Sequence, residues 1–167
     1  LTGSIPSGVS ALQQLTFLNL AENRLSGEIP EGISMLTDLD LLRLQANSLT
    51  GSIPSGVSSL QQLRNLNFGG NKLSGEIPAN VSLLTALSEL RLYTNSLTGS
   101  IPSGVSALQQ LTYLHFGGNK LSGEIPAEIS LLTALSSLQL YTNSLTGSIP
   151  SGVSALQQLT YLHFGGN

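Results

Sequence analysis

The sequence of 167 residues predicts an α/β-type solenoid, a fold in which one short unit is stacked many times along an axis. The first observation is a strict 24-residue period without insertions or deletions, which all seven prolines keep. The second is the pattern L-x-x-L-x-L-x-x-N-x-L-x-G-x-I-P, which returns in every period. A fixed period in this range is the mark of a repeat architecture. The asparagines that keep this period are Asn23, Asn47, Asn71, Asn95, Asn119, Asn143 and Asn167.

Each period begins with a predicted short strand and a 3₁₀ turn. Residues 1–6 alternate apolar and small polar side chains, and this strand should end at Pro6, because proline cannot donate to a ladder. Val9, Leu12 and Leu15 then fall three residues apart. Side chains at that spacing align in a 3₁₀ turn, which we expect on the convex side.

The main strand and a structural asparagine complete the period. Residues 16–20 should be extended, with Leu18 and Leu20 pointing inward and the residues between them outward. Asn23 then turns the chain inward. Because its amide both donates and accepts, a column of such asparagines can satisfy loop carbonyls and amides that would otherwise be unpaired. We interpret this column as structural and not catalytic.

The pattern resembles the plant-type leucine-rich repeat over the whole chain. Members of that class include receptor-kinase ectodomains and polygalacturonase-inhibiting proteins. The resemblance implies a right-handed leucine-rich-repeat superhelix with a parallel β-sheet on the concave face. It also implies short second strands, 3₁₀ or short helices on the convex side, and use of the fold to bind peptides, hormones or proteins.

A second, longer period of 48 residues is present. Leu92–Asn119 and Leu140–Asn167 are identical residue for residue, and Phe-Gly-Gly-Asn alternates with Tyr-Thr-Asn. We therefore expect residues 1–167 to form one uncapped array of about seven repeats, and to be a slice of a longer array. Near-identical rungs offer the same local surface repeatedly, which suits multivalent contact, lateral assembly or simple length.

Composition excludes several function classes. Charged residues make up 9% of the chain and the net charge is −3, without a basic cluster, so a nucleic-acid partner is not expected. The absence of cysteine excludes disulfides and thiolate metal sites within this segment. No apolar run is long enough for membrane insertion within this segment.

The outward positions of the predicted concave strands are the candidate partner-binding residues. These are Phe17, Asn19, Glu22, Arg43, Gln45, Asn67, Glu89, Arg91, Tyr93, Tyr113, His115, Gln139, Tyr141, Tyr161 and His163. Tyrosines, histidines and arginines are frequent recognition anchors. The alternative is a solvated face on which the aromatic rings merely stack on neighbouring rungs.

No metal, cofactor or catalytic site is predicted. His115 and His163 lie two rungs apart, about 10 Å at the spacing of strands, which is too far to share a zinc ion, so we expect exposed polar histidines. Glu28, Glu76 and Glu124 recur at the same separation on an open face without a pocket to perturb a pKa. Since no nucleophile elbow, phosphate loop or triad is present, we expect no enzyme activity.

One modification signal stands apart. Asn80-Val81-Ser82 is an N-glycosylation sequon on the predicted convex face, at a position that glycine occupies in most other rungs. The motif is short and often arises by chance. Asn80 is the candidate glycosylation site of a secreted eukaryotic protein.

Three functions compete. The first is a non-catalytic extracellular or cell-surface scaffold that binds a protein, peptide or glycan on its concave face. The alternative is a structural or adhesive array in a wall, filament or surface layer, which self-associates into a larger assembly. A weaker alternative is ice binding, because Thr2, Thr50, Thr98 and Thr146 align, although serines interrupt the column and glutamates flank it.

Overall fold

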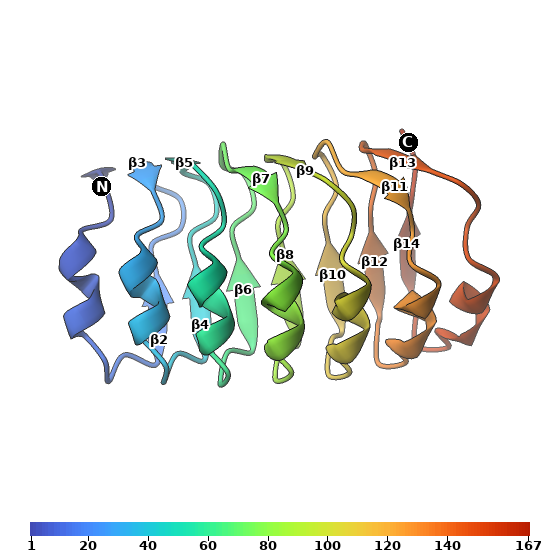
Figure 1. Cartoon of the computed structure of the whole chain (residues 1–167), viewed down its shortest axis with the longest axis horizontal. Helices are drawn as coiled ribbons and strands as arrows, with labels where there is room; N and C mark the ends of the chain where they lie inside the picture. The colour runs from blue at the N-terminus through green and yellow to red at the C-terminus, as the bar shows by residue number, and fades with distance from the viewer.

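The computed structural model describes all 167 residues as one solenoid, with a single parallel sheet along one side (Figure 1). Each 24-residue repeat forms one rung, and we number rungs 1 to 7 by the strand of this main sheet that each contains. The strands pair in order along the axis, which confirms the predicted concave parallel sheet. They are β2 (Phe17–Asn19), β4 (Leu41–Arg43), β6 (Asn65–Asn67), β8 (Glu89–Arg91), β10 (Tyr113–His115), β12 (Ser137–Gln139) and β14 (Tyr161–His163).

A row of 3₁₀ helices covers the opposite, convex side, as the three-residue spacing predicts (Figure 1). Each helix starts directly after a proline, whose carbonyl accepts the first helical hydrogen bond; Val9 N–H donates to Pro6 O at 3.1 Å. The helices are η1 (Ser7–Ala11), η2 (Glu31–Met35), η3 (Ser55–Ser59), η4 (Ala79–Leu83), η5 (Ser103–Ala107), η6 (Ala127–Leu131) and η7 (Ser151–Ala155).

The second strands form three small sheets in place of one continuous sheet. The groups are β1 (Thr2–Gly3), β3 (Arg24–Glu28) and β5 (Ser48–Thr50); β7 (Ser74–Glu76) and β9 (Ser96–Thr98); and β11 (Ser122–Glu124) and β13 (Ser144–Thr146). The prediction that these strands run to the proline is wrong, because β5 already ends at Thr50, before Pro54, which caps the next helix. Gly51, at φ +76°, turns the chain out of the strand in a conformation that glycine tolerates.

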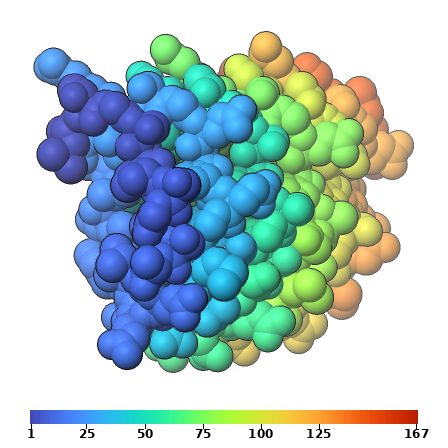
Figure 2. All heavy atoms as spheres, turned by 60° about the vertical axis from the view of Figure 1, so that its left-hand side comes forward, coloured from blue at the N-terminus to red at the C-terminus, as the bar shows by residue number.

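Columns of inward side chains fill the space between the sheet and the helices. The register pairs Leu42 with Leu66 and Leu66 with Leu90, so identical residues stack from rung to rung. Leu42 and Leu90 are fully buried, whereas Leu18 in rung 1 is only partly buried. In the space-filling view the rungs adjoin as successive bands of colour (Figure 2). Burial of these columns is the main favourable term in folding.

The asparagine column forms the predicted hydrogen-bond ladder. Asn71 Nδ2 donates to Leu44 O in the previous rung and to Phe68 O in its own, both at 3.0 Å. Its Oδ1 accepts from Leu49 N–H at 3.0 Å. The same contacts recur at Asn95 and, in full burial, at Asn119. The ladder therefore ties each loop to the rung before it.

No helix of the structure has the length and apolarity that crossing a bilayer requires.

Candidate functional site

Sequence differences between the odd rungs are concentrated on the concave face, which we define as the outward face of the main sheet. Residues 1–15 recur unchanged in rungs 3, 5 and 7, except that Ser59 replaces an alanine. The first outward strand position, in contrast, is Phe17, Asn65, Tyr113 and Tyr161 in these four odd rungs. In the odd rungs the helices and second strands are nearly invariant, so the concave face is where these rungs acquire individual chemistry. The even rungs also differ in their helices, which read EGISM in η2 and ANVSL in η4.

A continuous polar network crosses the first half of this face. Arg43 Nε donates to Asn65 Oδ1 at 3.1 Å, and Asn65 Nδ2 donates to Glu89 Oε2 at 2.7 Å. Glu89 also pairs with Arg91 at 2.9 Å. Arg91 then lies over the ring of Tyr113, with its guanidinium carbon 4.1 Å from the ring centroid. Four of the predicted partner-binding residues are thus already engaged with one another.

Stacked rings continue from the polar network into the last rungs. Tyr93 stacks on His115 with ring centroids 4.6 Å apart, and Tyr141 stacks on His163 at 4.5 Å. His115 Nε2 and the Tyr141 hydroxyl are 3.2 Å apart and form a hydrogen bond. The stacking of aromatic rings between rungs, weighed above as the alternative to partner binding, is therefore present. It orders the face without excluding a ligand on top of it.

The expectation that both histidines are exposed is wrong for His115. This side chain is 9% exposed because Tyr93 and Tyr141 lie against its two sides. Burial, with smaller contributions from the charges of Arg91 and His163, lowers the pKa of His115 to about 4. His115 is therefore neutral at physiological pH. His163, in the last rung, is half-buried.

Each tyrosine of the 48-residue unit also covers a glycine of the preceding rung. A Cβ atom added to Gly69 would stand 2.2 Å from Tyr93 Cε1, and one added to Gly117 would stand 2.5 Å from Tyr141 Cε1. Real Cβ atoms do not approach so closely, so the ring fits only over glycine. The tyrosine therefore rests on glycine on one side and stacks on histidine on the other. This interlock explains why the sequence alternates with a period of two rungs.

Other predicted residues vary in how much surface they offer. Phe17 and Tyr161 are 58% and 51% exposed. Asn67 is buried, and its Oδ1 accepts from Gly69 N–H at 3.1 Å. Its side chain thus satisfies a backbone amide just after the strand. Glu22 is exposed at a positive φ of 56°, and Gln45 is partly buried. The partner-binding role of these residues stays a prediction.

Asn80 lies on the convex side in η4, as predicted, but its side chain is engaged. Its Nδ2 donates to Ser55 O and to Ser58 Oγ, both at 3.0 Å. Nδ2 is the atom to which a glycan would be attached. Glycosylation in this conformation would require the side chain to leave η3. The sequon stays a prediction.

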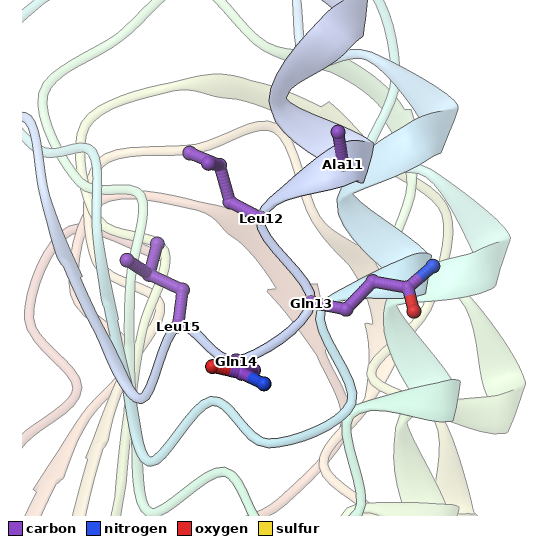
Figure 3. A pocket seen from close by; sticks show the side chains of 5 residues that line it. All are labelled: Ala11, Leu12, Gln13, Gln14 and Leu15. Atoms are coloured by element: carbon purple, nitrogen blue, oxygen red, sulfur yellow. The ribbon is translucent and has the colours of Figure 1, made fainter.

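Three further features lie outside the network and the stacked rings of the concave face. No group of three His, Asp or Glu side chains is placed to hold a metal ion. The Glu28 side chain lies along the surface over Gly51. A hollow of about 530 Å³ lies at the flank of rung 1, where Leu12 and Leu15 line it (Figure 3). Their equivalents Leu36 and Leu39 are fully buried core, so this hollow is an uncovered side of the core.

A second hollow of about 530 Å³ opens on the concave face between rungs 5 and 7. Tyr113 and Tyr161 stand at its two ends, and Ser137 and Gln139 of the intervening rung form its floor. We call these four residues the slot. Ser136 and Thr160 complete its lining.

Comparisons with known proteins agree with this architecture. The Leucine Rich Repeat family model matches residues 14–36, 62–84 and 110–132. No curated protein sequence matches the chain. The chain is similar to the plant peptide hormone receptor RGFR1, solved in complex with RGF2, with 41% identity and a TM-score of 0.94. This match covers 99% of the present chain and 26% of the receptor chain.

Two further solved structures define the family and its range. The BIR3–SERK2 complex from Arabidopsis thaliana contains a chain that is 41% identical, with a TM-score of 0.71, covering 78% of this chain and 69% of that one. A plant ice-binding protein is 36% identical, with a TM-score of 0.91, covering 100% of this chain and 54% of that one.

The chain belongs to the leucine-rich-repeat family. Within that family its repeat is of the plant type, and the predicted resemblance is confirmed. It spans about a quarter of the length of the receptor chains it matches, 26%, 29% and 23% for three of them.

Proposed function

We propose that this array is part of a non-catalytic recognition scaffold outside the cell, which binds a protein, peptide or glycan along its concave face. The observation that carries the proposal is the distribution of differences between rungs. Odd rungs keep one sequence through the helix and change at the outward strand positions, from Phe17 to Asn65 to Tyr113. A face built only for length or stacking gains nothing from such differences, whereas a recognition face requires them.

The likeness to receptor ectodomains supports the same proposal. RGFR1 is described as a peptide hormone receptor and was solved with RGF2. HAESA was solved with the peptide hormone IDA and the co-receptor SERK1, and is 39% identical to this chain. A location outside the cell follows from the same likeness. The structural-array hypothesis, with self-association, stays a prediction.

The test compares two double variants against immobilised peptide and oligosaccharide libraries. Phe17→Ser with Tyr161→Ser alters the concave face, and Met35→Ser with Leu83→Ser alters the convex face. All four side chains are between 51% and 58% exposed, so the variants are matched in exposure and both should fold. We expect binding to fall at least tenfold in the concave variant alone. Binding that depends only on the convex variant, or no saturable binding in either library, would overturn the proposal.

Ice binding is the second candidate, and two observations favour it. A plant ice-binding protein matches the whole length of this chain. On the second strands, Thr2, Thr50, Thr98 and Thr146 are all exposed and recur every second rung, with Glu28 paired opposite Thr50 and lying over Gly51. Hydroxyl groups at a regular spacing can match the lattice of ice, whereas the variable side chains of the concave face cannot. Thermal hysteresis that Thr50→Glu with Thr98→Glu abolishes would establish this function; a wild-type chain without hysteresis would exclude it.

A further inference from the structure

The slot is bounded by two tyrosine rings with a free path between them. Arg91 of rung 4 covers one face of the Tyr113 ring, and the hollow lies on the side of rungs 6 and 7. Strands are spaced by about 4.8 Å, so Tyr113 and Tyr161, two strands apart, are separated by about 10 Å. A six-membered ring in van der Waals contact on both faces, at 3.5–4.0 Å each, occupies about 8 Å. One such ring therefore fits between the tyrosines.

The chain contains its own comparison for this slot. Rungs 4 and 6 differ at four positions, and only two of them lie on the concave face: Glu89 is replaced by Ser137, and Arg91 by Gln139. In rung 4 the ion pair of Glu89 and Arg91, 2.9 Å apart, occupies the space in front of Tyr113. In rung 6 the smaller, neutral pair leaves the corresponding space in front of Tyr161 open. The slot therefore depends on these two replacements and on Tyr113, whose counterpart in rung 3 is Asn65.

The floor of the slot is buried, polar and uncharged. Ser137 and Gln139 are 5% and 8% exposed. Gln139 Nε2 donates to Ser137 Oγ at 3.1 Å and to the Tyr113 hydroxyl. Both N–H donors of the amide are thereby used, while the Gln139 Oε1 acceptor and the Ser137 hydroxyl proton face no protein partner. A ligand that displaces water from the slot must supply a donor and an acceptor to satisfy them.

We propose that the slot binds a neutral hexopyranose unit of a glycan, held between Tyr113 and Tyr161. The inference rests on the proposed role of the concave face in recognition and gives the ligand its chemical class. The C–H faces of a pyranose ring stack on aromatic rings, and its hydroxyls donate to Gln139 Oε1 and accept from Ser137. An aromatic or proline side chain of a peptide would leave both floor groups unpaired. No Asp, Glu, Lys, Arg or His lines the slot, which disfavours a charged sugar.

The decisive variant copies rung 4 into rung 6. Ser137→Glu with Gln139→Arg places the ion pair of rung 4 in the slot, and the new arginine would lie over Tyr161 as Arg91 lies over Tyr113. The control, Glu128→Asn with Ile129→Val, copies the other two rung 4 residues, which lie on the convex side. Both variants use residue combinations that this fold already contains, so both should fold. Bacterial expression avoids glycosylation of the sequon that the control creates.

Binding is measured by saturation-transfer NMR and calorimetry with neutral gluco-, manno- and galacto-oligosaccharides of four to six units. We expect one of these probes to bind saturably, with transfer to its ring C–H protons. Affinity should fall at least tenfold in Ser137→Glu with Gln139→Arg and stay within twofold in the control.

Three results would overturn the inference: no saturable binding, binding only to charged oligosaccharides, or equal binding by the slot variant and the wild type. A peptide could bind and lose its affinity in Phe17→Ser with Tyr161→Ser but keep it in Ser137→Glu with Gln139→Arg. That result would support the proposed recognition function and reject the proposed sugar site. Loss of all dependence on the concave face would reject both.

Discussion

The contact between Tyr141 and Gly117 makes a quantitative prediction about stability. In Gly117→Ala the new Cβ would lie 2.5 Å from Cε1 and 2.7 Å from Cδ1 of the tyrosine ring. Carbon atoms prefer 3.5–4.0 Å, so the ring must retreat by about 1 Å or more. Retreat disturbs its stacking on His163 and its hydrogen bond with His115. Overpacking of this kind costs about 1–3 kcal/mol.

A double-mutant cycle isolates that clash. Tyr141→Ala alone removes a half-buried ring and one aromatic stack, which we expect to cost about 1.5–3 kcal/mol. Once the ring is gone, the alanine at position 117 meets no clash and adds no further cost. The double variant should therefore be more stable than the sum of the single variants predicts, by about 1–3 kcal/mol.

Urea denaturation followed by circular dichroism measures each corner of the cycle. Gly8→Ala is the matched control, because a Cβ there would meet no atom within 4 Å and its cost should stay below about 0.5 kcal/mol. If the effects of Gly117→Ala and Tyr141→Ala add within about 0.5 kcal/mol, the interlock is not energetically real and the explanation of the 48-residue period fails.

Two further predictions concern buried polar groups. Because the pKa of His115 is lowered to about 4, the unfolded chain binds a proton below its ordinary value of 6.5 while the folded chain does not. The free energy of unfolding should keep its full value above pH 6.5 and fall by roughly 1–2 kcal/mol towards pH 4, which thermal unfolding at a series of pH values would record. The fall should vanish in His115→Asn, which places at position 115 the residue that rungs 1 and 3 carry there. Asn71→Leu removes the acceptor of Leu49 N–H, at roughly 1–3 kcal/mol for the amide left unpaired, whereas Leu44 O and Phe68 O keep donors from Asn47 and Asn95. An unchanged urea midpoint would disprove the ladder.

The sequence predicts the backbone and core of this protein well, for a physical reason. A 24-residue period imposes the same neighbours on every leucine, so Leu42, Leu66 and Leu90 can only stack on one another. Hydrogen-bond accounting similarly assigns Asn71, since a loop amide needs an acceptor and the Asn71 side chain supplies it. Both arguments use only local pattern and translation along the axis.

The concave face was less predictable because its state depends on side chains from neighbouring rungs. Strand alternation places His115 outward, but burial comes from Tyr93 and Tyr141, which cover it from either side. Tyr113, Gln139 and Tyr161 of the slot are among the predicted partner-binding residues, but Ser137 was missed and the hollow that the four residues enclose was not foreseen. The available signal was the comparison of rungs 4 and 6, where Ser137 and Gln139 carry the only differences on this face.

The interlock also decides how the array can change length. In the intact chain Tyr141 rests on Gly117. Removing residues 97–120 deletes one rung and places Tyr141 over Tyr93, so the ring meets another tyrosine in place of glycine. Removing residues 97–144 deletes two rungs and joins rung 4 to rung 7, whose residues 145–167 repeat 97–119 and restore the same contacts. Solenoid stability normally rises with the number of rungs. We nevertheless expect the shorter chain, with five rungs, to unfold at higher urea than the chain with six. If the six-rung chain is the more stable, each rung contributes stability whether its neighbours are odd or even rungs. The two-rung unit then makes no separate contribution to stability.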